Sequence, residues 1–177
     1  MTHPSVVRMT RFPLYEGEVL DGLRLRFVDV PAQHDTGAPP LVLLHGLASR
    51  LEEYEELIPF LCRHRRVVVL DLPGNGYSDK PDRPYTLRFL EDAVLALLDH
   101  LRIGQAHLGG GSLGGGMTVR LGHRVSERFP RLAPWAPAGA WEPMWLLPGL
   151  VRLLGGPRTF WPAMWVQSRF WYRRDWP

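Results

Sequence analysis

A serine set among glycines is the residue of this sequence best suited to chemistry. Ser112 lies in the pattern Gly110-x-Ser112-x-Gly114, between a short apolar stretch and a helical one. The pattern is typical of a nucleophile elbow, a sharp strand-to-helix turn that holds a serine hydroxyl strained and exposed. Glycines two residues before and after the serine are needed because the turn brings the two backbones close together. Ser112 is therefore the candidate nucleophile.

The same glycine-rich run has two other interpretations. A serine that precedes a helix is often an N-cap. The glycines at 109, 111 and 114 also match a dinucleotide-binding fingerprint. That fingerprint belongs on the first βαβ unit and needs an acidic residue about 20 positions later. Here no acidic residue occurs between Glu127 and Glu142, so dinucleotide binding is a remote alternative, and we expect neither a cofactor nor a metal ion.

Two further motifs precede the serine, and each follows a short apolar run. The first is Leu-His-Gly-Leu, with His45 and Gly46 at its centre. The second runs from Asp71 to Asp79, and turn formation is the simpler explanation of both aspartates than a catalytic role. Asn75, in the same turn, is expected either to face a pocket or to be a plain turn residue.

Together the three motifs closely resemble the α/β-hydrolase family over about residues 17–138, with the spacing of its smaller single-domain esterases. The resemblance implies an oxyanion hole made by the backbone N–H groups of Leu47 and Leu113. Such fixed donors stabilise the negative charge that acyl transfer places on a carbonyl oxygen. It also implies a structural role for His45 beside this loop. Serine at the nucleophile position argues against dehalogenases and epoxide hydrolases, which use a carboxylate in this fold.

The base and acid that such a serine needs are unassigned. In the family the acid follows the seventh strand and the histidine the eighth, whereas no histidine here follows a late strand. Glu142 follows the expected sixth strand, where a few relatives carry the acid. If the chain turns a substrate over, His45 and His123 are the first candidates for the base.

The resemblance thus implies a C-terminally truncated serine hydrolase that lacks the triad acid and histidine. Its substrate would be a small, apolar, ester-like molecule, with esters, thioesters, lactones and C–C bonds of diketones all open. The alternative is an α/β-hydrolase-like protein that binds apolar ligands or a partner without catalysis.

The elements that must position these residues alternate between apolar strands and amphipathic helices. This alternation predicts an α/β fold with a mostly parallel sheet flanked by helices and with its last strands missing. The expected elements are a hairpin at 17–30, strands at 41–44, 67–70 and 105–108, helices at 51–62, 86–101 and 112–129, and a strand at 132–138 weakened by two prolines.

The C-terminal part differs in composition from the rest. All seven tryptophans lie between Trp135 and Trp176. We therefore divide the chain into a hydrolase-like core, 1–138, and the start of a Trp-rich cap, 139–177. Within the cap, two pairs of tryptophans spaced four residues apart can each share a helix face.

Composition excludes several other classes of protein. The 177 residues carry a net charge of +3, and the one tight basic run, 63–66, is expected to be a solvated loop, so no nucleic-acid partner is expected. No apolar run approaches the roughly 18 residues of a membrane span. The lone Cys62 fits a buried thiol in a reducing compartment, and the N-terminus lacks an apolar signal segment, so we expect a cytoplasmic protein.

Overall fold

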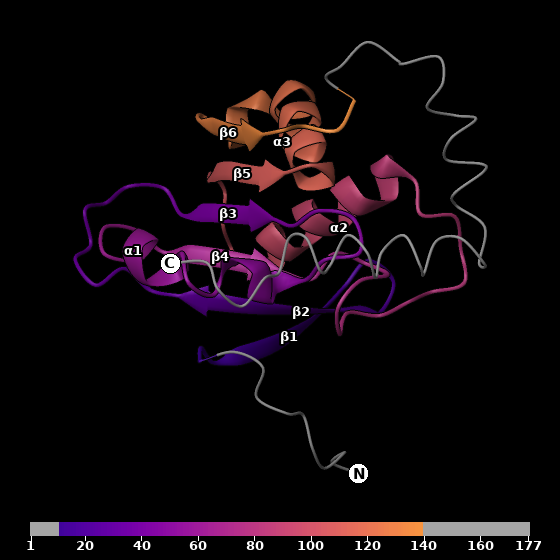
Figure 1. Ribbon diagram of the computed structural model, residues 1–177, viewed down its shortest axis with the longest axis horizontal. Helices are drawn as coiled ribbons and strands as arrows, with labels where there is room; N and C mark the ends of the chain where they lie inside the picture. The colour runs from indigo at the N-terminus through magenta and orange to yellow at the C-terminus, as the bar shows by residue number, and fades with distance from the viewer. Residues whose placement is uncertain (1–10, 140–177) are drawn as a thin grey trace, which may run out of the picture. The chain divides into compact units, whose positions relative to one another are not determined.

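The computed structural model describes residues 11–139 (Figure 1). The contacts of the chain divide it into two units, Met1–Ala140 and Trp141–Pro177. The described residues belong to the first unit, whose end lies two residues beyond the boundary expected at 138. All of the predicted Trp-rich cap except Gly139 lies outside the described residues, as does Glu142.

Within residues 11–139, six strands form one mixed, mostly parallel sheet in the order β1-β2-β4-β3-β5-β6, which Figure 1 shows from bottom to top. β1 pairs with β2, and β2 with β4, in antiparallel register, whereas β4, β3, β5 and β6 run parallel. The expected α/β fold class is therefore confirmed. The strands are β1 (Leu14–Val19), β2 (Leu23–Val30), β3 (Leu41–Leu44), β4 (Val67–Leu70), β5 (His107–Gly111) and β6 (Leu132–Trp135).

The helical segments fall where apolar periodicity predicts them, with two corrections. They are the 3₁₀ turn η1 (Leu51–Tyr54), α1 (Ile58–Leu61), α2 (Leu87–His100), α3 (Leu113–Arg124) and the 3₁₀ turn η2 (Ser126–Arg128). The single helix predicted over 51–62 is wrong. Pro59 stands in the first turn of α1 and has no amide to bond back to Glu55, so a helix from 51 cannot run through it. The helix predicted over 112–129 ends at Arg124.

The two faces of the sheet are covered by different helices. Along β3 the side chains alternate, because successive residues of a strand point to opposite faces. Val42 and Leu44 pack in a cluster with residues of α2 and α3, whereas Leu43 packs with residues of η1 and α1. All four residues of β4 are buried, as expected of a strand covered on both faces.

Local signals at the hairpin and at α2 act as predicted. Asp21 and Gly22 both have positive φ, 58° and 87°, and the Leu23 amide donates to the Leu20 carbonyl. This is the turn that Asp-Gly favours between antiparallel strands. The Thr86 side chain accepts a hydrogen bond from the Phe89 amide at 3.1 Å and so caps α2.

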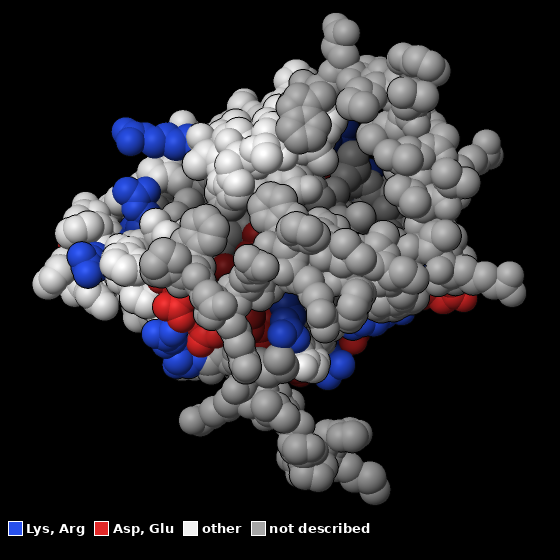
Figure 2. All heavy atoms as spheres, in the orientation of Figure 1, with Lys and Arg blue, Asp and Glu red and all other residues white. Residues whose placement is uncertain are grey.

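The surface carries charges of both signs. On the face shown in Figure 2, acidic and basic side chains are intermingled. Arg24, for example, pairs with both Glu16 and Asp79 at 3.3 and 3.2 Å. Within residues 11–139 no helix is long and apolar enough to cross a membrane.

Candidate active site

Ser112 occupies the turn between β5 and α3 in a strained conformation. Its φ and ψ are 52° and −116°, and its side chain is exposed. A residue with a side chain in this region costs of order 1–3 kcal/mol, and such strain concentrates at functional sites. The Ser112 hydroxyl makes no capping hydrogen bond to α3. The geometry is therefore that of a strained strand-to-helix turn, as the glycine spacing predicts, rather than that of a side-chain N-cap.

The flanking glycines have no room for a side chain. A Cβ on Gly110 would lie 2.6 Å from the Gly114 carbonyl carbon and 2.7 Å from the Leu44 oxygen. A Cβ on Gly114 would overlap the same Leu44 oxygen. The backbones of β5, α3 and β3 thus meet around the Leu44 carbonyl, which explains the glycine spacing around the serine.

The backbone of Ser112 is fixed from the direction of β6. Its amide donates to the Trp135 carbonyl at 3.2 Å, and its carbonyl accepts from the amides of Gly116 and Ala138 at 2.9 and 2.8 Å. The Trp135 indole lies where a side chain on Gly111 would be. Three backbone hydrogen bonds therefore fix the serine, while the residue itself remains exposed.

The loop after β3 lies directly beside the serine. A Cβ on Gly46 would be 3.5 Å from the Ser112 Cβ and 4.0 Å from its Oγ. The fully buried His45 holds this loop, because its Nδ1 donates to the Gly46 carbonyl at 2.7 Å and its Nε2 accepts from the Leu72 amide at 3.0 Å. These partners define a neutral ring. Burial lowers the pKa of His45 from its ordinary value, in agreement with that state.

The bond to the Gly46 carbonyl bears on the expected oxyanion hole. The Gly46 carbonyl and the Leu47 N–H belong to one planar trans peptide and point in opposite directions. By holding the oxygen, His45 also sets the direction of the Leu47 N–H. Leu113 is the first residue of α3, where amides lack helical partners and the helix dipole is positive. Among residues 11–139, neither amide donates to a backbone carbonyl.

The motif that follows β4 forms a tightly bonded turn. Asp71 is fully buried and accepts hydrogen bonds from the amides of Leu51 and Tyr77 at 2.7 and 2.8 Å. Asp79 accepts from the Arg24 amide at 2.8 Å. Asn75 donates to the Pro73 carbonyl at 3.0 Å and so acts as a turn residue. Both aspartates support the turn, and Asp71 also fixes the start of η1.

Sequence reasoning missed two charged residues beneath this turn, Arg26 and Glu52. Their side chains are 4% and 10% exposed and form an ion pair, with the Arg26 Nη1 2.9 Å from a Glu52 oxygen. The signal that could have revealed the pair is the position of Arg26 between Leu25 and Phe27, on β2, which lies between two other strands of the sheet. An arginine at such a position needs a buried acid.

No histidine among residues 11–139 offers a free ring nitrogen to Ser112. His45 uses both of its nitrogens. His107 begins β5 and contacts Arg65, so at about 3.3 Å per residue its Cα is roughly 16 Å from that of Ser112. His123 lies eleven residues along α3, again roughly 16 Å away at about 1.5 Å per residue. His100 ends α2, against Gly17, and His34 and His64 lie near each other in loops outside the strands and helices.

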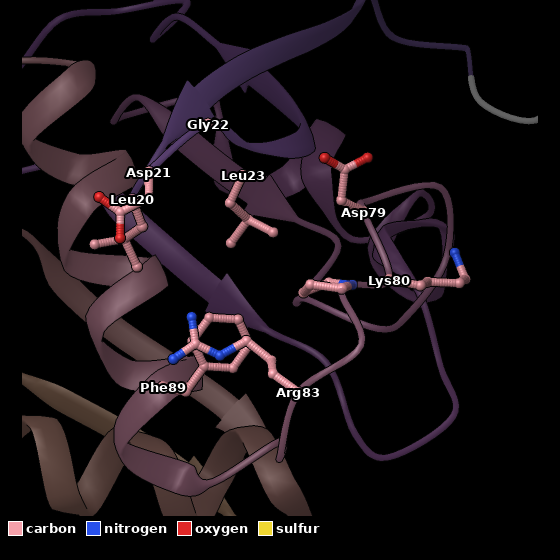
Figure 3. Close-up of a pocket in the computed structure, with 9 residues that line it drawn as sticks. Leu20, Asp21, Gly22, Leu23, Asp79, Lys80, Arg83 and Phe89 are labelled. Carbon is pink, nitrogen blue, oxygen red and sulfur yellow. The ribbon is translucent and has the colours of Figure 1, made fainter.

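A cavity of about 390 Å³ lies away from Ser112, between the β1–β2 turn, the segment 79–83 and the start of α2 (Figure 3). Its lining includes Leu23, Asp79, Arg83 and Phe89, and none of the predicted site residues. The Arg83 guanidinium lies over the Phe89 ring, 4.3 Å from its centroid. Within the described part of the chain no group of His, Cys, Asp or Glu is arranged to hold a metal ion.

The comparison with protein families agrees with this geometry. The alpha/beta hydrolase fold family matches residues 39–148, more than half of the chain. The chain belongs to the alpha/beta hydrolase fold family. The matched segment includes the loop after β3, the turn after β4 and the turn at Ser112, so all three predicted motifs lie within it.

Individual relatives of this hydrolase-family chain are diverse. It is 37% identical over 116 residues to a 2-hydroxymuconate semialdehyde hydrolase of Pseudomonas sp. strain CF600, covering 63% of this chain and 41% of the relative. It is 42% identical over 106 residues to the dihydrolipoyllysine-residue acetyltransferase component of the acetoin cleaving system of Pseudomonas putida, covering 60% and 29%. The chain thus spans less than half the length of these curated relatives.

Solved structures show the same fold. The enol-lactonase from Burkholderia xenovorans LB400 is 30% identical and superimposes with a TM-score of 0.72, covering 88% of this chain and 59% of that one. The relatives' names describe several reactions, so membership in this hydrolase family does not specify a substrate.

Proposed function

We propose that this chain carries the nucleophile and the oxyanion hole of a serine hydrolase. The observation that carries the proposal is Ser112, exposed and strained at φ 52° between β5 and α3 with a glycine two residues to either side. Its Oγ would attack a carbonyl carbon, and the N–H groups of Leu47 and Leu113 would stabilise the resulting oxyanion. Transfer of the serine proton to a base completes the step.

The proposed substrate is a small apolar ester or a related carbonyl compound. Leu47, beside the serine, is 74% exposed, and Trp135 on the other side is 42% exposed. These side chains favour an apolar group next to the reacting carbonyl. The names of two relatives, a semialdehyde hydrolase and an enol-lactonase, both specify carbonyl-bearing substrates. Lactones therefore stand beside simple esters in the proposed class.

The proposed base lies outside residues 11–139, because the histidines within that range are either bonded at both nitrogens or distant from Ser112. A non-catalytic, apolar-ligand-binding role is the second candidate. The observation that favours it is the engagement of both His45 nitrogens, which leaves this histidine, next to the loop beside the serine, unable to accept its proton.

The two candidates are separated by one assay on the purified 177-residue chain. A short-chain p-nitrophenyl ester is the substrate, and Ser112→Ala is the control. Saturable hydrolysis that Ser112→Ala abolishes supports the serine hydrolase. Saturable binding of the ester without Ser112-dependent hydrolysis supports the binding protein and rejects catalysis by this chain.

The oxyanion hole has its own geometric test, a structure of the chain with a phosphonate or boronate on the Ser112 Oγ. The proposal expects both amide nitrogens within about 3.1 Å of the oxygen that represents the oxyanion. A Leu47 amide directed away from that oxygen would remove Leu47 from the site.

A further inference from the structure

A buried cluster of charges lies beneath the loop that carries Leu47. Arg26, on β2, uses all three guanidinium nitrogens. Nη1 and Nη2 each donate to one oxygen of Glu52 at 2.9 Å, and Nε donates to Asp71 at 2.6 Å. The guanidinium also lies over the Tyr77 ring, 4.4 Å from its centroid. The cluster thus joins β2, η1 and the turn after β4.

The charge state of the cluster follows from its surroundings. The Asp71 side chain is fully buried, and that of Glu52 is 10% exposed. Burial lowers the pKa of Arg26, but hydrogen bonds to Glu52 and Asp71 outweigh this effect and raise it above the ordinary value. The guanidinium therefore stays charged and separates two carboxylates that would otherwise repel each other.

The two ends of the loop after β3 are tied to consecutive residues, Asp71 and Leu72. At the end of the loop the Leu51 amide donates to Asp71 Oδ1 at 2.7 Å. At its start the Leu72 amide donates to the His45 ring, which in turn holds the Gly46 carbonyl. Arg26 donates to Asp71 and also to Glu52, the residue that follows Leu51, so it holds the end of the loop through both acids.

We propose that Arg26 is a positioning residue for the oxyanion hole. By fixing Asp71 and Glu52, it holds both ends of the 45–52 loop and thereby the direction of the Leu47 N–H. Arg26 touches no reacting atom in this scheme, and its effect reaches Ser112 only through that loop. The catalytic part of the inference rests on the proposed function, whereas the ordering of the loop does not.

The chain offers a control in a second, less buried arginine–carboxylate pair that also involves β2. Arg66, just before β4, makes a bidentate pair with Asp29 of β2 at 2.7 and 2.6 Å. This pair also joins β2 to the start of β4, but at the opposite end of the strands from the 45–52 loop. A variant at Arg66 therefore tests for general loss of an arginine–aspartate pair.

The first measurement is amide hydrogen exchange of the full chain, comparing Arg26→Met with Arg66→Met. Exchange across 45–52 should rise about tenfold or more in Arg26→Met, in excess of any change in β3 and β5. In Arg66→Met, the ratio of the exchange rate of the 45–52 loop to that of β3 and β5 should stay as in the wild type. Arg26→Lys, which keeps the charge but loses the two-pronged pair, should fall between Arg26→Met and wild type. Equal acceleration of the loop and the strands in Arg26→Met would overturn the proposal.

The second measurement is the kinetics of ester hydrolysis, in which loss of a positioning residue and loss of a purely structural residue have different effects on kcat and KM. Arg26→Lys should lower kcat roughly tenfold to a hundredfold with KM within about threefold, because a misplaced donor weakens transition-state binding. Arg66→Met should keep kcat within about twofold. A rise in KM at constant kcat would contradict a role in positioning the donor. If wild-type hydrolysis does not depend on Ser112, the proposed function fails and the exchange measurement alone decides the ordering role.

A failure of Arg26→Met to fold does not end the test. Glu52→Gln removes one carboxylate and leaves the Arg26–Asp71 pair in place. The same loop-specific acceleration is expected from it, and uniform exchange across loop and strands would overturn the proposal.

Discussion

The His45 ring accepts a hydrogen bond from the Leu72 amide at 3.0 Å, and this bond joins the ends of two neighbouring parallel strands, β3 and β4. An imidazolium has no lone pair for that bond, so the fold needs the neutral ring. His45, which by residue type could be a catalytic base, therefore links the loop after β3 to the turn after β4 by hydrogen bonds.

The pH dependence of stability follows from this bond. Burial depresses the pKa of His45 in the folded chain, so its contribution is fully present above the unfolded value of about 6.5 and is lost as pH falls below it. The free energy of unfolding by urea should decline between pH 7 and 5, by at most about 1.4 kcal/mol per pH unit for one group. His45→Gln should flatten this slope, and equal slopes in the two proteins would contradict the assignment. His107, whose pKa is also lowered by burial and by Arg65 and Arg131, should account for part of the remaining slope.

Relief of the strain at Ser112 should increase the stability of the folded chain. Ser112→Gly relieves a positive φ and is expected to raise the free energy of unfolding by about 1 kcal/mol, while it removes the hydroxyl. Ser126, at the start of η2, has an ordinary backbone conformation. Ser126→Gly should instead lower stability by about 0.5–1 kcal/mol. Chemical denaturation of both variants checks the sign, and a loss in Ser112→Gly would mean that the turn is not strained.

The close approach of β3 and α3 predicts a large difference between two glycines. A methyl group on Gly114 would overlap the Leu44 carbonyl, so Gly114→Ala should lower the free energy of unfolding by about 3 kcal/mol or prevent folding. A Cβ on Gly104 would have nothing within 4 Å. Gly104→Ala should change stability by no more than about 0.5 kcal/mol. Similar losses in both variants would contradict the packing described around Leu44.

A second buried acid, Glu91 of α2, should reveal how α2 and α3 are joined. Its side chain is 1% exposed and pairs with Arg120 and Arg124 of α3, at 2.5 and 3.2 Å. Replacing both arginines by methionine should cost about 3–5 kcal/mol, because a buried carboxylate loses its partners. Arg88→Met removes the exposed Arg88–Asp92 pair and should cost less than about 1 kcal/mol. Comparable losses in thermal or urea unfolding would show that Glu91 does not need its partners.

Much of the fold could be predicted because its signals are local. The continuous apolar run of β4, the Asp-Gly turn and the Thr86 cap each depend on residues within a few positions of one another. The strand-to-helix turn at Ser112 was predictable for the same reason, since its glycines meet within a single connection. Pro59 was also a local signal, and reading through it produced the mistaken helix over 51–62.

The remaining features depend on pairings across the chain. Arg26 and Asp71 are 45 residues apart, and their pairing exists only because β4 lies next to β2 in the sheet. No local signal in the sequence indicates that adjacency, so the sequence predicts only a turn-forming role for Asp71. The two nitrogens of His45 were equally unpredictable, since their partners are backbone groups rather than side chains.

The position of β4 has a consequence for the order in which the chain can assemble during synthesis. Both neighbours of β4, the β2 strand of the hairpin and β3, precede it in the chain, so the pairing of these three strands waits only for β4 to be made. Within residues 11–139, the two later strands each add to a free edge, β5 to β3 and β6 to β5. Because domains fold from the N-terminus as they are made, this part of the sheet can be completed once residue 70 has been synthesised, before Ser112 leaves the ribosome.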